Sequence, residues 1–139
     1  MKRQAFISPI GILAAVGMIG LGLSLPAFAQ PAANTLAMLD SLTKGEWTIK
    51  YRDGSADRRI CVRTGQELIQ LQHSQSNCTR FVVEDEANNV TVQYTCPGNG
   101  YGHTKIRKET AGLVQIETRG IASGLPFEFA AEARRTGSC

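Results

Sequence analysis

Four cysteines constrain this chain more than any other feature of its sequence: Cys61, Cys78, Cys96 and Cys139. An even number of cysteines in an exported chain indicates two disulfides, because the compartments outside the cytoplasm are oxidising. No two of the four have the C-x2-C spacing typical of zinc sites or of redox-active pairs. The sequence therefore predicts two structural disulfides and no metal site.

Four cysteines allow three pairings, and we expect Cys61 to bond with Cys78 and Cys96 with Cys139. The first bond would bracket a short helix and hold it to the strands on either side. The second would fix the last residues of the chain, which fray unless they are tied down, to the body of the domain.

The first 29 residues have the pattern of a Sec-type signal peptide. Lys2 and Arg3 precede an uncharged apolar stretch, and the small residues Ala27 and Ala29 fit a signal-peptidase site. We expect cleavage after Ala29 and a periplasmic or secreted protein. The alternative, an uncleaved membrane anchor, is disfavoured because about 16 apolar residues are short for a bilayer that needs ~20. No later run is long enough to span a membrane.

Without this segment the charge of the chain is almost balanced. Residues 30–139 contain 13 basic and 12 acidic residues, because the signal segment contains Lys2 and Arg3 and no acidic residue. So small a surplus does not indicate a nucleic-acid partner or a polybasic membrane-binding patch.

The remaining sequence divides into a lead over residues 30–44 and one domain over residues 45–139. Residues 35–42 favour a short helix, and residues 64–74 predict a second one, because Thr64 and Glu67 have the spacing of a capping box. Alternating apolar residues, with Trp47, Ile49 and Tyr51 as the clearest case, predict strands. They cover residues 46–52, 58–62, 79–85, 90–96, 104–110, 113–120 and 125–134.

Every predicted connection between these strands is short, which favours antiparallel pairing because parallel strands need long crossovers. We therefore expect an α+β fold, mostly β: an antiparallel meander sheet, curved or partly closed, with one short helix, residues 64–74, packed on it and two disulfides.

The most distinctive stretch for binding is the Gly-rich segment 97–102 and the strand after it. Glycines let backbone N–H groups converge on an anion, and basic side chains follow on one strand face. We take five residues as weak candidates for binding a small anionic ligand or an envelope protein: Asn99, Tyr101, His103, Lys105 and Arg107. The alternative is an ordinary hairpin loop beside solvated basic residues. No cofactor motif is present.

Catalytic signals are weak. His73 and His103 are the only histidines, and we expect both on the surface. Either could act as a general base near neutral pH, but no nucleophile elbow or metalloprotease motif accompanies them. The sequence thus predicts no catalytic residue.

Several short segments have to be considered together: residues 45–47, Cys61 and Cys78, residues 94–100, residues 112–116 and the ending 132–139. With them, residues 45–139 resemble a family of small exported proteobacterial proteins known as a domain of unknown function, with four cysteines and a Cys-Pro-Gly-Asn-Gly loop. This resemblance implies a periplasmic location and disulfides, and it implies no activity or catalytic residue.

We therefore expect an exported periplasmic protein that acts as a non-enzymatic binding or envelope-associated domain. One alternative is a small hydrolase-like periplasmic enzyme that uses His103 near the Gly-rich loop. Another is a purely structural or stress-related envelope protein, in which the basic residues would be dispensable and the disulfides would not.

Overall fold

The computed structural model describes residues 36–139, so the predicted signal peptide and residues 30–35 lie outside the described residues. Strands dominate this part of the chain, as predicted. Its elements are α1 (Ala37–Asp40), β1 (Gly45–Tyr51), β2 (Arg58–Val62), the 3-10 turn η1 (Gln66–Leu68), β3 (Thr79–Asp85), β4 (Asn89–Cys96), β5 (Gly100–Thr110), β6 (Leu113–Ala122) and β7 (Leu125–Gly137).

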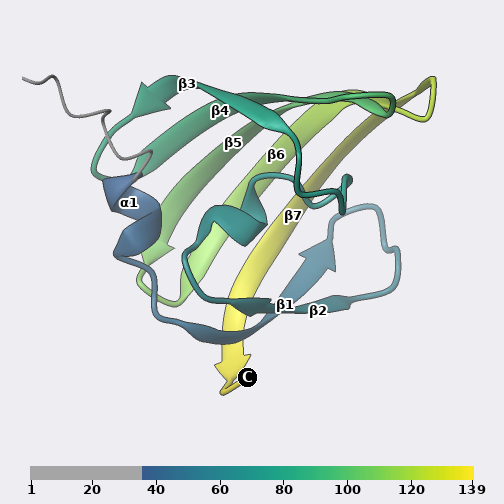
Figure 1. The fold of residues 1–139 in the computed structure, drawn as a ribbon. Coiled ribbons are helices and arrows are strands. Elements are labelled where there is room, and N and C mark those ends of the chain that lie inside the picture. The colour runs from purple at the N-terminus through teal and green to yellow at the C-terminus, as the bar shows by residue number, and fades with distance from the viewer. Residues whose placement is uncertain (1–35) are drawn as a thin grey trace, which may run out of the picture. The chain divides into compact units, whose positions relative to one another are not determined.

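The seven strands form one antiparallel sheet in the order β2-β1-β7-β6-β5-β4-β3 (Figure 1). From β3 to β7, consecutive strands are neighbours, which fits their short connections. The first strand departs from this rule, because β1 pairs with β7 on one side and with β2 on the other. The sheet is not closed, so β2 and β3 are its two edges.

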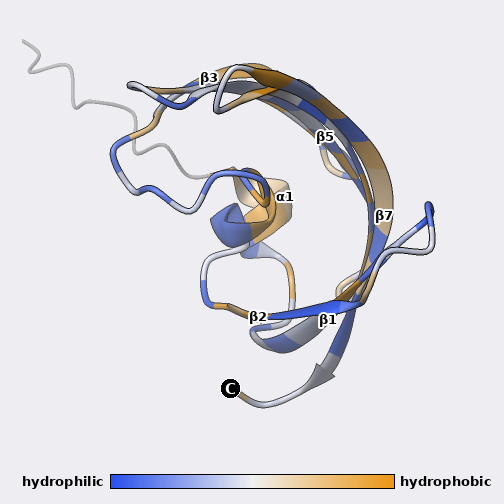
Figure 2. Cartoon of the chain, turned by 90° about the vertical axis from the view of Figure 1, so that its right-hand side faces the viewer, coloured by the Kyte–Doolittle hydropathy of each residue, from blue (hydrophilic) through white to orange (hydrophobic). Residues whose placement is uncertain are grey.

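One face of the sheet carries the core. In Figure 2, α1 and the turn η1 lie within the bend of the sheet, and we call the face toward them the inner face. Trp47 and Ile49 of β1 are fully buried there, as the alternation predicts. Burying one side chain of this size contributes roughly 1.5–3 kcal/mol. The other core residues are Leu36, Met38, Leu39, Leu42, Val62, Leu68, Ile69, Leu71, Val90, Val92, Tyr94, Cys96, Ile106, Val114, Ile116, Ala131 and Ala133.

The prediction of a helix over residues 64–74 is wrong, because only the 3-10 turn Gln66–Leu68 forms there. The capping contacts are present, since the backbone N–H of Thr64 donates to the Glu67 carboxylate at 3.2 Å. The segment after them does not continue as a helix. Its carbonyls instead accept hydrogen bonds from strand side chains, Ile69 from Thr104 at 2.6 Å and Leu71 from Arg58 at 2.6 Å. The apolar residues still pack on the sheet, but as an irregular segment.

Both disulfides form, but the predicted pairing is wrong: the bonds are Cys61–Cys139 and Cys78–Cys96. The strand register explains both. Glu46 of β1 is paired with Cys61 on one side and with Gly137 on the other, so the residues after Gly137 can reach Cys61. Cys78 and Cys96 adjoin the paired residues Thr79 and Thr95, which places the two cysteines opposite each other.

Candidate functional site

The Gly-rich segment is a tight turn between β4 and β5, and Asn99 holds it in place. Its side-chain Nδ2 donates to Oε1 of Gln75 at 2.9 Å. Its Oδ1 accepts from the backbone N–H of Ser123 at 3.0 Å and from the Ser123 hydroxyl at 3.1 Å. Asn99 therefore joins this turn to the turn between β6 and β7, and its amide is occupied by contacts within the chain.

The other four candidates from the sequence lie together. Tyr101, His103, Lys105 and Arg107 occupy alternate positions of β5, while the residues between them, Gly102, Thr104 and Ile106, are buried on the inner face. Because side chains alternate along a strand, the four share the opposite face, which we call the outer face.

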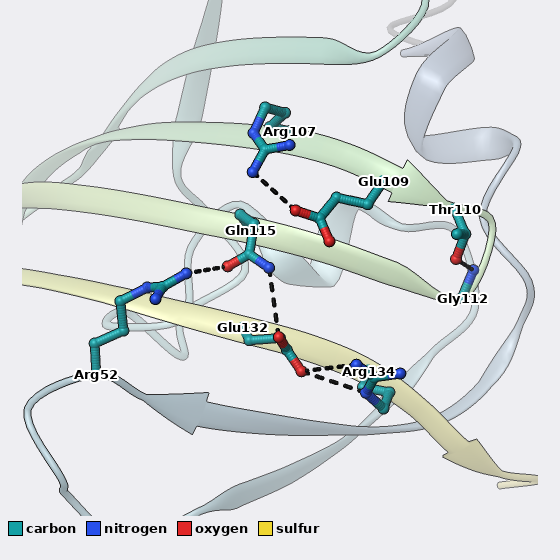
Figure 3. A network of polar contacts seen from close by, with 8 residues as sticks. All are labelled: Arg52, Arg107, Glu109, Thr110, Gly112, Gln115, Glu132 and Arg134. Carbon is teal, nitrogen blue, oxygen red and sulfur yellow. Dashed lines mark hydrogen bonds and ion pairs between the residues drawn. The ribbon is translucent and has the colours of Figure 1, made fainter.

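One end of the outer face is a network of contacts within the chain (Figure 3). Arg107 forms an ion pair with Glu109 at 2.8 Å. Arg52 donates to Oε1 of Gln115 at 2.6 Å, and Glu132 accepts from both Gln115 and Arg134. Arg107 and Arg134 at this end are therefore matched by carboxylates, and Arg52 is held by a neutral amide oxygen.

The other end contains a shallow hollow of about 320 Å³ over β5, β6 and β7. The strand register builds it. His103 is opposite Arg119, which is opposite Glu128, and Lys105 is opposite Glu117. Ala130, opposite Glu117, leaves room for the hollow because its side chain is small. The hollow is lined by His103, Lys105, Glu117, Thr118, Arg119, Glu128, Phe129 and Ala130.

The charged side chains around this hollow are not engaged with one another. Within residues 36–139, no side-chain hydrogen bond or ion pair involves any of them, in contrast to the network at the other end. The members of this set are His103, Lys105, Glu117, Arg119 and Glu128. Sequence reasoning missed the last three, because their place beside β5 depends on the register of β6 and β7.

The sequence analysis predicted His73 on the surface, and this prediction is wrong. His73 is buried, with 2% of its surface exposed. Its Nδ1 lies 3.0 Å from the Tyr94 hydroxyl, and its ring contacts Tyr94 and Phe127 edge-on. Burial raises the pKa of Tyr94 to about 12. The Tyr94 ring covers Gly102, where any Cβ would lie 2.4 Å from the ring. His73 is thus part of the core, because the irregular segment after η1 carries it onto the inner face.

His103 is half-buried at the edge of an open hollow, and within the described part of the chain it makes no hydrogen bond to a carboxylate or hydroxyl group. Residues 36–139 contain no group of three His, Cys, Asp or Glu side chains placed to hold a metal ion. None of the helices in this range is long and apolar enough to cross a membrane.

Comparison of the chain with models of known families, with curated proteins and with solved structures finds no match. The resemblance described from the sequence therefore stays a prediction.

Proposed function

We propose that this protein is an exported, non-enzymatic binding domain that contacts its partner through the hollow on the outer face. One observation carries the proposal: the charged side chains around the hollow are unpaired within the described chain, while Arg107 with Glu109 and Arg134 with Glu132 form ion pairs at the other end of the same face. Charged groups that are already matched have little to offer a ligand. Unpaired groups around a depression can bind one without first breaking contacts.

The charges favour a ligand with an anionic group. Lys105 and Arg119 are diagonal neighbours on adjacent strands, close enough for long side chains to share one carboxylate or phosphate. On β4, the uncharged Gln93 and Thr91 lie opposite His103 and Lys105. Glu117 on β6 lies opposite Lys105, and Glu128 on β7 lies opposite Arg119, so the hollow suits a ligand that has hydrogen-bond donors beside its anionic group.

The proposed location rests on independent features. Two disulfides indicate an oxidising compartment. The pattern of residues 1–29 and the resemblance to exported proteins support a periplasmic or envelope-associated location. The same resemblance leaves the ligand open, so the anionic group is argued from the hollow alone.

The test is a titration of the full chain, expressed for export so that both disulfides form, monitored by amide NMR shifts. Inorganic phosphate represents a small anionic ligand, and polyglutamate represents an acidic segment of an envelope protein. We expect shifts confined to the hollow, and at least a tenfold weaker affinity in the Lys105→Ala/Arg119→Ala variant for the probe that binds.

The matched control is Lys50→Ala/Arg107→Ala, which removes the same charge from the outer face but outside the hollow. It should bind like the unaltered chain. If both variants bound the probe equally weakly, the effect would be one of net charge and not of the hollow. If neither probe shifted any amide signal, a purely structural role would be favoured.

A further inference from the structure

The two edges of the sheet differ, and β3 is the one that exposes apolar residues. Phe81, Val82 and Val83 follow one another on β3 and are 69%, 39% and 53% exposed. Edge strands of soluble proteins are usually protected by lysine, proline or inward-pointing charges, because their unpaired backbone groups can bind another strand. Residues 79–85 contain no lysine or proline; they contain one irregularity, between Val82 and Glu84, and charged residues of both signs at their two ends.

The backbone of β3 directs two residues toward the free edge. In antiparallel sheets, opposite residues alternate between pairs that exchange hydrogen bonds, with Cα atoms about 5.5 Å apart, and pairs that do not, about 4.5 Å apart. The Cα atoms of Cys78 and Cys96 are 4.2 Å apart, so these two residues form a pair that does not exchange hydrogen bonds. Arg80, two residues on, has the same orientation, and its backbone N–H and C=O point away from β4.

Asp85 has the same orientation at the other end of β3. The backbone N–H of Glu86 donates to the carbonyl of Asn89 at 2.8 Å, so Asp85, one residue earlier, belongs to a pair that does not exchange hydrogen bonds. The irregularity between Val82 and Glu84 accommodates one extra residue. As a result, Arg80 and Asp85 are on the same face of the sheet although they are five residues apart: their β4 neighbours, Tyr94 and Val90, are both buried on the inner face.

We propose that β3 pairs with β3 of a second copy of this chain, antiparallel and about a two-fold axis between Val82 and Val83. This register places Arg80 opposite the partner's Asp85, with both backbones directed toward the new ladder and both side chains on the same face. It places Phe81 opposite the partner's Glu84. Six apolar side chains, Phe81, Val82 and Val83 from each copy, surround the axis.

Charge favours this pairing at β3 and does not favour the equivalent one at β2. The β3 edge has a positive residue near its start, Arg80, and negative residues at its end, so antiparallel self-pairing brings unlike charges together. The side-chain partners of Arg80 are the neutral amide oxygens of Gln66 and Gln70, which leave its positive charge unmatched. The β2 edge begins with Arg58 and Arg59 and contains no acidic residue between Arg58 and Val62, so antiparallel self-pairing there brings no unlike charges together.

A symmetric contact closes after two copies, because each copy has one β3 edge. The dimer joins two seven-stranded sheets edge to edge and leaves the hollow over β5 to β7 open. The inference therefore does not depend on the proposed function.

The proposed pairing of two β3 strands is tested by exchanging the charges of Arg80 and Asp85. The oxidised full chain is measured by sedimentation over a range of concentrations at low salt. We expect a dimer, at least tenfold weaker dimerisation in Arg80→Glu and in Asp85→Arg, each of which creates two like-charge pairs, and recovery in the Arg80→Glu/Asp85→Arg double variant. Arg59→Glu, on the β2 edge, is the control and should dimerise like the unaltered chain.

Three outcomes would overturn the proposal: a monomer at all concentrations, open-ended polymers instead of a dimer, or a folded double variant that does not recover. Arg80→Glu also loses its contacts to Gln66 and Gln70, so Asp85→Arg provides the measurement that is independent of them. Amide hydrogen exchange tests the register: the N–H groups of Arg80 and Asp85 should be protected in the dimer and should lose that protection in Asp85→Arg. Fast exchange of both in the dimer would rule out this register.

Discussion

The two edge strands of the sheet, β2 and β3, share a similar disulfide and arginine contact but differ in the side chains that they expose. Each edge strand has a disulfide near one end, and each has an arginine bound to the irregular segment around η1: Arg58 from β2 and Arg80 from β3. At β2 the disulfide ties the strand to the segment after β7, across β1, and charged side chains line the edge. At β3 the disulfide joins only the neighbouring strand β4, and the middle of the strand stays apolar and exposed.

The two disulfides differ in how many strands each one connects. Cys61–Cys139 spans β2, β1 and the end of β7, so it fixes the position of the whole edge. Cys78–Cys96 strengthens a hairpin whose strands are already paired. It leaves the free side of β3 available to a further strand.

The largest effect that would separate the edges is the loss of each disulfide. Cys61 and Cys139 are 78 residues apart and Cys78 and Cys96 are 18 apart, so loop-closure entropy gives about 4.5 and about 3 kcal/mol respectively. We expect Cys61→Ser/Cys139→Ser to lower the free energy of unfolding, measured by urea denaturation, by more than Cys78→Ser/Cys96→Ser does. The reverse order would show that β3 depends more on its disulfide than β2 does.

A smaller effect concerns the two arginines. Arg58 donates to the backbone carbonyl of Leu71 in a partly buried position, so Arg58→Met should cost about 1.5–3 kcal/mol, as for other hydrogen bonds of charged groups. Arg80 contacts exposed glutamine side chains, and Arg80→Met should cost about 0.5–1 kcal/mol. Thermal unfolding measures both. Arg59→Met, at an exposed position, is the control, and a cost for Arg80→Met as large as that for Arg58→Met would remove the distinction.

The smallest effect is the pH dependence of the turn that follows β2. Partial burial acts to raise the pKa of Glu67, but hydrogen bonds from the backbone N–H groups of Glu67, Arg63 and Thr64 outweigh it, and the pKa is lowered from its ordinary value of 4.5. The ionised form therefore stabilises the fold above that value, and this contribution is lost as the pH falls through the lowered pKa.

We expect Glu67→Gln to be slightly less stable than the unaltered chain at neutral pH and to lose less stability on acidification. Denaturation series between neutral and acidic pH measure this difference. Thr64→Val, which removes the hydroxyl contacts to Glu67 and to the backbone N–H of Gln66, should fall between the two. An unchanged acid slope in Glu67→Gln would assign that slope to other carboxylates.

Local pattern predicted the strands well, and it predicted the faces where burial alternates, as along β1, β5 and β6. Trp47 and Ile49 face the core, and Tyr101, His103, Lys105 and Arg107 share the outer face, as their spacing indicates. The sequence contains no comparable signal for the pairing of β1 with β7, which joins residues from opposite ends of the domain. The Cys61–Cys139 bond depends on that contact, whereas Cys78–Cys96 depends on the register of β3 with β4, and the predicted pairing was wrong for both bonds.

The candidate site was predictable only in its β5 part for the same reason. His103 and Lys105 follow from alternation, but Arg119, Glu117 and Glu128 join them only through the register of β6 and β7. The helix prediction for residues 64–74 was wrong for a different reason. Its capping pattern is real, but the carbonyls that a helix would use are bound by Arg58 and Thr104, which no local pattern reveals.

The contact between β1 and β7 also sets the order in which the sheet can assemble. Trp47 pairs with Arg135, so this seam joins residues far apart along the chain, whereas β3 to β7 are connected by short turns. Closing a long loop is slow compared with forming a hairpin. We therefore expect the hairpins to form first and the seam last. Until β1 pairs with β7, the apolar face of β1 has no neighbour on that side. A chain in which β7 is not yet available therefore cannot bury Trp47 and Ile49 against it.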